Sequence, residues 1–385
     1  MTRRRRQVAT VITRLEGGAG VLALRGARAL DAASHRVTII TGSGGRLLRE
    51  AASCGLETVV EPALCAPIAP WHDLKALRNL TTLFARRGFD VVHTHCAKAG
   101  AVGRLAAHRT GVPRIVHTFH GFPFHPFQSA LRHRGYIAVE RGLGSITDLA
   151  LGVGAGVTVE AVRRALVPPE RIRTIGVAVD PEAPEATDPA RRSARRALDV
   201  PEATTVVGAV GRVTYQKAPE DFVHALRALA RSNVMGVWVG GGELAGEVRR
   251  LAARVLPRGS LLITGDRTDV TELLPAFDVF ALPSRYEGLP LAVVEAMVSG
   301  VPVVATAVNA VSDAVLPGET GLLVPPGRPD LLAGAVAHLL DHPHEAARMA
   351  AAARARVRPH HTASTLAEAL TAAYQPVFTP HVNAA

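Results

Sequence analysis

Cysteine is scarce in this sequence. Its 385 residues include only Cys54, Cys65 and Cys96, which show neither a paired spacing nor a CxxC motif. Chains with this usage are typical of reducing compartments, where disulfide bonds do not persist. We therefore expect a cytoplasmic protein without disulfide bonds.

Long apolar runs are also missing. No uncharged apolar segment approaches the ~20 residues that a transmembrane helix needs. In the N-terminal segment MTRRRRQVATVITRLEGG, the apolar run VATVIT is followed at once by Arg14 and Glu16, so the segment does not fit a secretory signal. The arginines at positions 3 to 6 form either a solvated tail or a contact with anionic lipid. The expected location therefore includes the inner face of the membrane.

Lysine is rare as well. The 44 basic residues include only three lysines, Lys75, Lys98 and Lys217, and the formal net charge is +11. This excess reflects either an arginine-rich genome or attraction to an anionic partner, such as a phosphorylated ligand or a membrane surface. The arginines are scattered and the sequence has no aromatic–basic binding motif, which argues against a nucleic-acid partner.

Aromatic residues make up only 4% of the chain, yet four of its ten phenylalanines lie in the segment FHGFPFHPF at positions 119–127. Arg132, His133 and Arg134 follow shortly after. The segment either packs on its own domain, forms a wall for an acceptor substrate, or presents an amphipathic patch to a membrane.

The hydrophobic content, 48% against 20% charged residues, indicates a globular protein, and 385 residues suffice for two domains. Short β-branched runs alternate with helix-length segments such as 73–87 and 219–232. This alternation predicts a doubly wound parallel α/β architecture. The predicted strands occupy residues 8–13, 36–41, 57–60, 90–95, 114–119 and 148–153 in the first half, and 204–211, 236–241, 260–265, 279–284, 301–306 and 321–326 in the second.

A polar, proline-bearing stretch at residues 180–192 separates the two halves and predicts a linker. We expect a Rossmann-like acceptor-side domain over residues 1–182 and a Rossmann-like donor domain over residues 193–362. A helix at about 363–377 is expected to pack back on the first domain. Neither half contains GxGxxG, which removes the best support for an NAD enzyme. Two such halves predict a ligand in a cleft between them, outside the carboxyl ends of the strands.

The stretch SRYEGLPLAVVEAM, residues 284–297, carries Glu287 and Glu295 around an apolar run. In one continuous helix the two carboxylates would be poorly placed to share a bond, as a glycosidase pair must. We instead expect Glu287 in a loop after a strand, Pro290 in the first helical turn, and Glu295 on a helix that ends at Gly300. Free N–H groups between the glutamates would bind an anion. A nucleotide-sugar, with phosphate between two hydroxyl-rich groups, fits this pattern.

A second group of charges lies where the first strand of the second half ends. Arg212 and Lys217 occupy the strand-to-helix turn GRVTYQK, and Lys217 is the only lysine after residue 98. Two cations at such a turn can neutralise a diphosphate, because arginine binds it bidentately and lysine adds a point charge. The combination with Glu287 and Glu295 makes the signal specific.

Arg212-x4-Lys217 followed by Glu287-x7-Glu295 resembles the signature of the family-4 retaining glycosyltransferases with the GT-B fold. VVHTHCAKAG (91–100), VHTFHGFPFH (116–125) and the turn LEGGAG (15–20) also resemble family landmarks, so the resemblance covers nearly the whole chain. The segment IGVAVD (175–180) departs from it, because the family often has asparagine-glycine there.

The resemblance implies a role for each site residue. Arg212 and Lys217 would hold the donor diphosphate and stabilise it as leaving group. Glu287 would bind sugar hydroxyls, Glu295 the ribose hydroxyls, and His120 the donor sugar. The nucleobase would lie near residues 265–267. Further donor contacts are implied at Gly17, Gly18, Gly211, Arg267, Gly288 and Leu289.

The implied activity is transfer of a sugar, with retention, from a nucleotide-sugar to an acceptor hydroxyl in glycan, glycolipid or secondary-metabolite biosynthesis. By the resemblance the donor is UDP-linked, and no cofactor is needed beyond this substrate. His93 and His95 share a strand face, but without a third committed ligand we expect no metal site. Two alternatives remain: a sugar-nucleotide epimerase of the same fold, and a non-catalytic nucleotide-sugar-binding protein.

Overall fold

A computed structural model describes residues 4–31, 34–125, 127–179 and 183–375. The start of the predicted linker (180–182), position 3 of the arginine cluster and the last two positions of the predicted C-terminal helix (376–377) lie outside the described residues. The chain divides into two compact units. The N-terminal unit comprises the described residues up to 153, residues 158–175 and those from 363 onward; the C-terminal unit comprises residues 154–157 and 176–362.

The N-terminal unit contains a parallel sheet of seven strands among the described residues, in the order β3-β2-β1-β4-β5-β6-β7. Six of them were predicted. The seventh, β7, was missed because it has only three residues, two of which are exposed, so it lacks the apolar run of a buried strand. The strands are β1 (Arg6–Leu15), β2 (His35–Gly44), β3 (Glu57–Val60), β4 (Val91–His95), β5 (Arg114–Phe119), β6 (Leu149–Gly152) and β7 (Ile172–Thr174).

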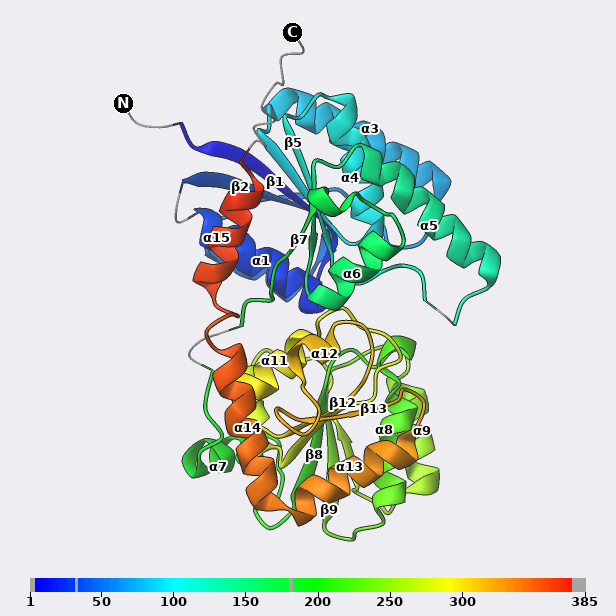
Figure 1. Cartoon of the computed structure of the whole chain (residues 1–385), viewed down its shortest axis with the longest axis vertical. Helices are drawn as coiled ribbons and strands as arrows, with labels where there is room; N and C mark the ends of the chain where they lie inside the picture. The colour runs from blue at the N-terminus through cyan, green and yellow to red at the C-terminus, as the bar shows by residue number, and fades with distance from the viewer. Residues whose placement is uncertain (1–3, 32–33, 126, 180–182, 376–385) are drawn as a thin grey trace. The chain divides into compact units, whose positions relative to one another are not determined.

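Helices cover both faces of this sheet (Figure 1). On one face, α3 and α4 pack through a cluster that includes Ala76, Leu80 and Phe84, which recur at the four-residue spacing of one helix face. On the other face, α1 lies beside α15. The helices are α1 (Gly17–Asp31), α2 (Arg46–Ser53), α3 (Pro70–Arg87), α4 (Ala97–Arg109), α5 (Ala130–Ser145), α6 (Ala155–Arg163), which begins in the C-terminal unit, and α15 (Ala363–Ala373).

The C-terminal helix α15 is tied to the N-terminal unit by hydrogen bonds at its end. Tyr374, which is buried, accepts a bond at its carbonyl from the Arg6 guanidinium (3.0 Å), and its hydroxyl lies 2.7 Å from Nδ1 of His93. Nε of Arg114 donates to the carbonyl of Ala373 (3.0 Å). Arg6 therefore belongs to β1 and to this contact, so the prediction that positions 3 to 6 form either a solvated tail or a lipid contact does not hold for Arg6.

The described residues of the C-terminal unit form a parallel sheet of six strands in the order β10-β9-β8-β11-β12-β13. All six were predicted, because each is a short apolar run; β8, β9, β11 and β12 are almost wholly buried, whereas β10 and β13 each have two partly exposed leucines. The strands are β8 (Thr205–Val210), β9 (Val234–Val239), β10 (Leu261–Ile263), β11 (Val279–Leu282), β12 (Val303–Thr306) and β13 (Leu322–Val324). The helices are α7 (Asp188–Ala197), α8 (Pro219–Leu229), α9 (Ala245–Val255), α10 (Val270–Leu273), α11 (Leu291–Val298), α12 (Val311–Ala314), α13 (Pro329–Asp341) and α14 (Pro343–Val357).

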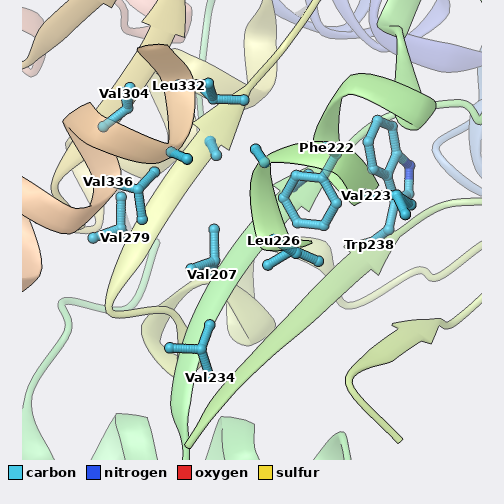
Figure 2. Close-up of a cluster of buried hydrophobic side chains, with 14 of the residues drawn as sticks. Val207, Phe222, Val223, Leu226, Val234, Trp238, Val279, Val304, Leu332 and Val336 are labelled. Carbon is cyan, nitrogen blue, oxygen red and sulfur yellow. The ribbon is translucent and has the colours of Figure 1, made fainter. Parts of the chain in front are cut away.

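Figure 2 shows the core of this unit, where α8 and α13 meet the sheet. Val207 and Val279 project from β8 and β11 toward Phe222 of α8 and Val336 of α13. Trp238 of β9 is almost fully buried, and its indole N–H donates to the carbonyl of Gly211 (2.7 Å). The core thus holds the loop that follows β8 in place.

Both sheets have their first strand in the middle, so the strand order reverses beside it. The reversal falls between β1 and β4 in one unit and between β8 and β11 in the other. In open α/β sheets, ligands bind at such a switch point, outside the carboxyl ends of the strands. The predicted doubly wound α/β class is confirmed. The switch points are the expected positions of a ligand site.

Candidate active site

The loops that leave β8 and β11 meet at the switch point of the C-terminal unit. The Lys217 ammonium, in a short 3-10 turn after β8, lies 2.6 Å from Oε1 of Glu287, in the loop after β11. The hydroxyl of Ser284 donates to the same oxygen (2.6 Å), and Nε2 of Gln216 reaches Oε2 (3.2 Å). Both carboxylate oxygens of Glu287 are therefore engaged, and the residue is only 5% exposed.

The two loops are also joined through backbone and aromatic contacts. The N–H of Arg285 donates to the carbonyl of Gln216 (2.8 Å), and Nε2 of Gln216 donates to the carbonyl of Tyr286 (3.0 Å). The Arg285 guanidinium lies 4.2 Å from the centre of the Tyr215 ring and pairs with Glu220. These contacts fix the position of the Lys217–Glu287 pair. Sequence reasoning missed both Ser284 and Gln216, whose shared partner is Glu287. Gln216 is 71 positions from Glu287 in the sequence, so only folding brings these two residues together.

Glycine is required at the start of this loop. Gly211 has φ = 146°, and a Cβ there would lie 3.0 Å from Cε of Lys217. The neighbouring Arg212 is exposed and forms no salt bridge with any described residue. The site thus offers one cation held against Glu287 and one cation open to solvent.

The glutamate-bearing segment after β11 has the expected loop-then-helix form. Pro290 was predicted to lie in the first helical turn. It instead directly precedes α11 in an extended conformation (φ −72°, ψ 116°). Within the described part of the chain, the backbone N–H groups of Gly288, Leu289, Leu291 and Ala292 donate no hydrogen bond. Glu295 lies on α11 and is 7% exposed. Free donors therefore lie between the two acids, as an anion site requires.

The loop after β10 is the predicted position of the nucleobase. Arg267 forms a two-point ion pair with Asp269, with N–O distances of 2.8 and 2.6 Å, so its guanidinium already has a local partner. Oδ1 of Asp266 accepts a bond from the N–H of Gly241 in the loop after β9 (3.0 Å). The ends of β9 and β10 are therefore linked to each other; β9 lies next to β8, whose loop carries Lys217, and β10 is the strand beyond it.

The remaining predicted site residues belong to the N-terminal unit. Gly17 and Gly18 are exposed at the start of α1, directly after β1, and Gly17 has φ = 62°. His120 follows β5, and its Nε2 lies 2.9 Å from Nδ1 of His95. Burial lowers the pKa of His120 to about 4, so the ring is neutral at pH 7. All three lie at the carboxyl edge of their own sheet.

His120 is part of a buried histidine cluster. The rings of His93 and His95 are 4.2 Å apart, His93 bonds Tyr374 and Thr118, and His117 bonds Thr94. A cavity of about 10 Å³, enough for about one water, lies beside His93 and His95. No group of three potential ligands within the described ranges could hold a metal ion. His95 and His120 hydrogen-bond each other, whereas His93 and His117 bond the hydroxyl groups of other residues.

The phenylalanine segment packs largely on itself. The rings of Phe122 and Phe124 are stacked 4.8 Å apart, and Phe119 lies 5.4 Å from Phe122. Phe127 is the exposed member, and position 126 lies outside the described residues. Nowhere in the described ranges does the chain form a helix with the length and apolar character to cross a membrane.

Comparisons with known proteins agree with this geometry. Residues 16–183 match the family model "Glycosyltransferase Family 4", and residues 190–356 match "Glycosyl transferases group 1". The chain is 30% identical over 288 residues to an alpha-D-kanosaminyltransferase of Streptomyces kanamyceticus, covering 72% of this chain and 74% of that protein. The chain therefore belongs to the family-4 glycosyltransferases of the GT-B fold.

A further sequence relative and a solved structure are also similar to the chain. An Escherichia coli UDP-Gal:alpha-D-GlcNAc-diphosphoundecaprenol alpha-1,3-galactosyltransferase is 32% identical over 253 residues, covering 64% of this chain. That match spans just under two thirds of the E. coli enzyme, 65% of its length. The crystal structure of Anabaena Alr3699/HepE in complex with UDP and glucose has a TM-score of 0.83 at 19% identity, covering 96% of this chain and 99% of that one.

Proposed function

We propose that this glycosyltransferase moves a hexosyl group from a UDP-sugar to an acceptor hydroxyl, with retention at the anomeric carbon. The observation that carries the proposal is the Lys217–Glu287 pair, held beside the open cation of Arg212 at the switch point. Sugar transfer from a nucleotide-sugar is served by cations at the leaving diphosphate and by a hydrogen-bond acceptor at the sugar hydroxyls, and these three residues provide both.

Lys217 and Arg212 would act on the leaving diphosphate. Negative charge develops there as the bond from sugar to phosphate breaks, so a cation that binds the leaving group more tightly in the transition state lowers the barrier. The four free N–H groups between Glu287 and Glu295 add positive potential at the same end of the sheet. Together these groups would neutralise the charge that a metal ion neutralises in other transferases.

Glu287 is better suited to bind sugar hydroxyls than to attack the anomeric carbon. Its two oxygens already accept bonds from Lys217, Ser284 and Gln216, which lowers its nucleophilicity. A front-face reaction needs no such nucleophile, because the departing phosphate oxygen takes the proton of the acceptor hydroxyl. This arrangement supports retention without a covalent intermediate.

The rest of the donor would bind along the same edge. Glu295 would accept the ribose hydroxyls, Gly211 would let the backbone approach the phosphates, and residues 265–267 would receive the nucleobase. Residues of the N-terminal unit, Gly17, Gly18 and His120, would complete the donor contacts. Uridine is favoured because the E. coli relative is named for UDP-Gal and the Anabaena protein is bound to UDP.

The acceptor class is suggested by the relatives. The E. coli enzyme is named for a sugar diphosphoundecaprenol, and the Streptomyces relative for kanosaminyl transfer. We favour a lipid-linked glycan intermediate, made in the cytoplasm at an anionic membrane surface, over a small metabolite, because the chain carries a net charge of +11. Such an acceptor would bring the enzyme to the inner face of the membrane.

The first experiment is a thermal-shift panel of nucleoside diphosphates and their sugars, followed by product analysis. UDP at 100 times its dissociation constant should stabilise the protein by about 2.7 kcal/mol. With donor and acceptor present, the protein should release UDP even when EDTA is added. NMR should show an axial glycosidic bond in the product. A changed sugar in the absence of acceptor would instead indicate an epimerase. Donor binding without UDP release from any acceptor would indicate a sensor.

A further inference from the structure

An exposed apolar row lies at the start of α3, the helix that follows β3 on the outside of the N-terminal unit (Figure 1). Ile68 is 70% exposed, Trp71 83% and Leu74 58%. The same helix buries Ala76, Leu80 and Phe84 against the core, so its inward face is already satisfied. A large exposed tryptophan beside two exposed aliphatic residues is the kind of patch that marks an interaction surface.

Cations continue the row along the helix. Positions 71, 74, 75 and 78 lie on one helical face, and Lys75 and Arg78 are exposed there. Between residues 62 and 89 the only acid is Asp73, and it is paired with Lys98 at 2.5 Å. The patch therefore presents apolar side chains next to unpaired positive charge, with no free carboxylate on this helix to oppose an anionic partner.

The row also lies at the functional edge of its sheet. Because α3 follows β3 in a parallel sheet, its first turn lies at the carboxyl ends of the strands. Gly17 follows β1 and His120 follows β5 at that same edge. Binding of a partner through Trp71 would therefore hold the carboxyl edge of the sheet close to that partner.

We propose that Ile68, Trp71, Leu74, Lys75 and Arg78, here called the α3 face, dock onto an anionic lipid bilayer. Tryptophan sits at the boundary between headgroups and acyl chains, aliphatic side chains bury in the acyl region, and lysine or arginine binds the anionic headgroups. The residue types of the α3 face match these three layers. The proposal concerns surface binding and requires neither donor nor acceptor.

Tryptophan fluorescence can test the proposal at one residue. The chain has two tryptophans, and the second, Trp238, is 2% exposed and hydrogen-bonded in the core of the other unit. Vesicles of phosphatidylcholine with phosphatidylglycerol should therefore shift the emission of Trp71 to the blue, and a lipid-borne quencher should reduce it. Pure phosphatidylcholine vesicles should bind at least tenfold more weakly, and 1 M salt should weaken binding to the mixed vesicles.

Variants separate this surface from others. Trp71→Ser with Leu74→Ser should abolish vesicle sedimentation, and Lys75→Ala or Arg78→Ala should each weaken it about fivefold. Val159→Ser, which removes another exposed aliphatic residue of the same unit, should bind normally. Because all these side chains are exposed, the variants should melt like the native protein.

Three results would overturn the proposal: no emission shift with anionic vesicles, undiminished sedimentation of the Trp71→Ser/Leu74→Ser variant, or equal binding to neutral vesicles. A blue shift that grows with protein concentration in the absence of lipid would assign the face to a second copy of the chain instead. The assay contains no donor, so its failure is distinguishable from a failure of UDP release.

Discussion

Lys217 and Glu287 are 70 positions apart in the sequence, yet their charged groups lie 2.6 Å apart. The pair joins the loops of two adjacent strands, β8 and β11, at the point where the strand order reverses. A cation and an acid that meet there can act on opposite ends of one bond, the cation on the leaving phosphate and the acid on the sugar.

Removal of either cation should strongly lower the rate of sugar transfer and leave the fold intact. Lys217→Ala or Arg212→Ala should lower kcat about 10²–10³-fold, by comparison with the loss of one oxyanion-hole donor. Arg250→Ala, which changes another exposed arginine of the same unit, should leave kcat unchanged. The measurement is the steady-state rate of UDP release, with circular dichroism to check the fold. Normal turnover in Lys217→Ala would contradict the assigned role.

Glu295→Ala should weaken donor binding. The side chain is buried on α11, one helical turn beyond the free N–H groups, where the ribose hydroxyls are proposed to lie. The melting shift induced by a fixed UDP concentration should shrink, with the shift rather than the absolute Tm compared between variants. Glu319→Ala, an exposed acid of the same unit, serves as the control. An unchanged UDP shift in Glu295→Ala would place the ribose elsewhere.

Ser284→Ala should loosen the ion pair. The Ser284 hydroxyl, fully buried, donates to Oε1 of Glu287, and its loss leaves that carboxylate with fewer donors in a site sheltered from water. We expect a loss of about 1–3 kcal/mol in the free energy of unfolding, measured by urea denaturation, together with a lower kcat. Ser312→Ala, at an exposed serine, should change the free energy of unfolding by less than about 0.5 kcal/mol. Equal stability of the two variants would show that the bond to Glu287 contributes little.

Acid should destabilise the N-terminal unit through its histidine cluster. Burial lowers the pKa of His93 to about 3 and of His120 to about 4, and it also lowers the pKa of His95 and His117. The Arg104 guanidinium lowers the pKa of His117 further. Below pH 6.5 the unfolded chain takes up protons that the folded chain does not, so the stability present above pH 6.5 falls as the pH drops toward 4.

The size of this effect is testable by urea denaturation at several pH values. Each buried histidine should contribute up to about 1.4 kcal/mol per pH unit between pH 6.5 and 4. His120→Asn should reduce the slope by one such contribution, whereas His108→Gln, at an exposed histidine, should not. A flat stability profile in the native protein would show that these histidines take up protons as readily in the folded chain as in the unfolded chain.

Tyr374→Phe should weaken the attachment of α15 without affecting donor binding. The change removes the hydroxyl that lies 2.7 Å from His93 and leaves that buried ring nitrogen without this partner. We expect a loss of about 1 kcal/mol in the free energy of unfolding. The UDP-induced melting shift should be unchanged, because Tyr374 is not among the proposed donor contacts, most of which lie in the other unit. A lost UDP shift would mean that α15 influences the donor site.

The sequence by itself determined the fold class and most of the elements. Buried parallel strands must be short, apolar and β-branched, and that signal is local, so twelve of the thirteen strands among the described residues were predicted from it. It failed for β7, whose exposed Arg173 and Thr174 leave no apolar run. The loop-then-helix form around Glu287 and Glu295 also followed from local chemistry, with Pro290 misplaced by one position.

Only the tertiary structure decided which charges meet. Nothing local in GRVTYQK indicates that Lys217 pairs with Glu287, that Gln216 and Ser284 complete the hydrogen bonds of that carboxylate, or that Arg212 alone remains open. Those contacts depend on β8 and β11 being neighbours, which parallel topology sets over a separation of 70 residues. Residue types at a strand end are written in the sequence, but the distances between them arise when the sheet assembles.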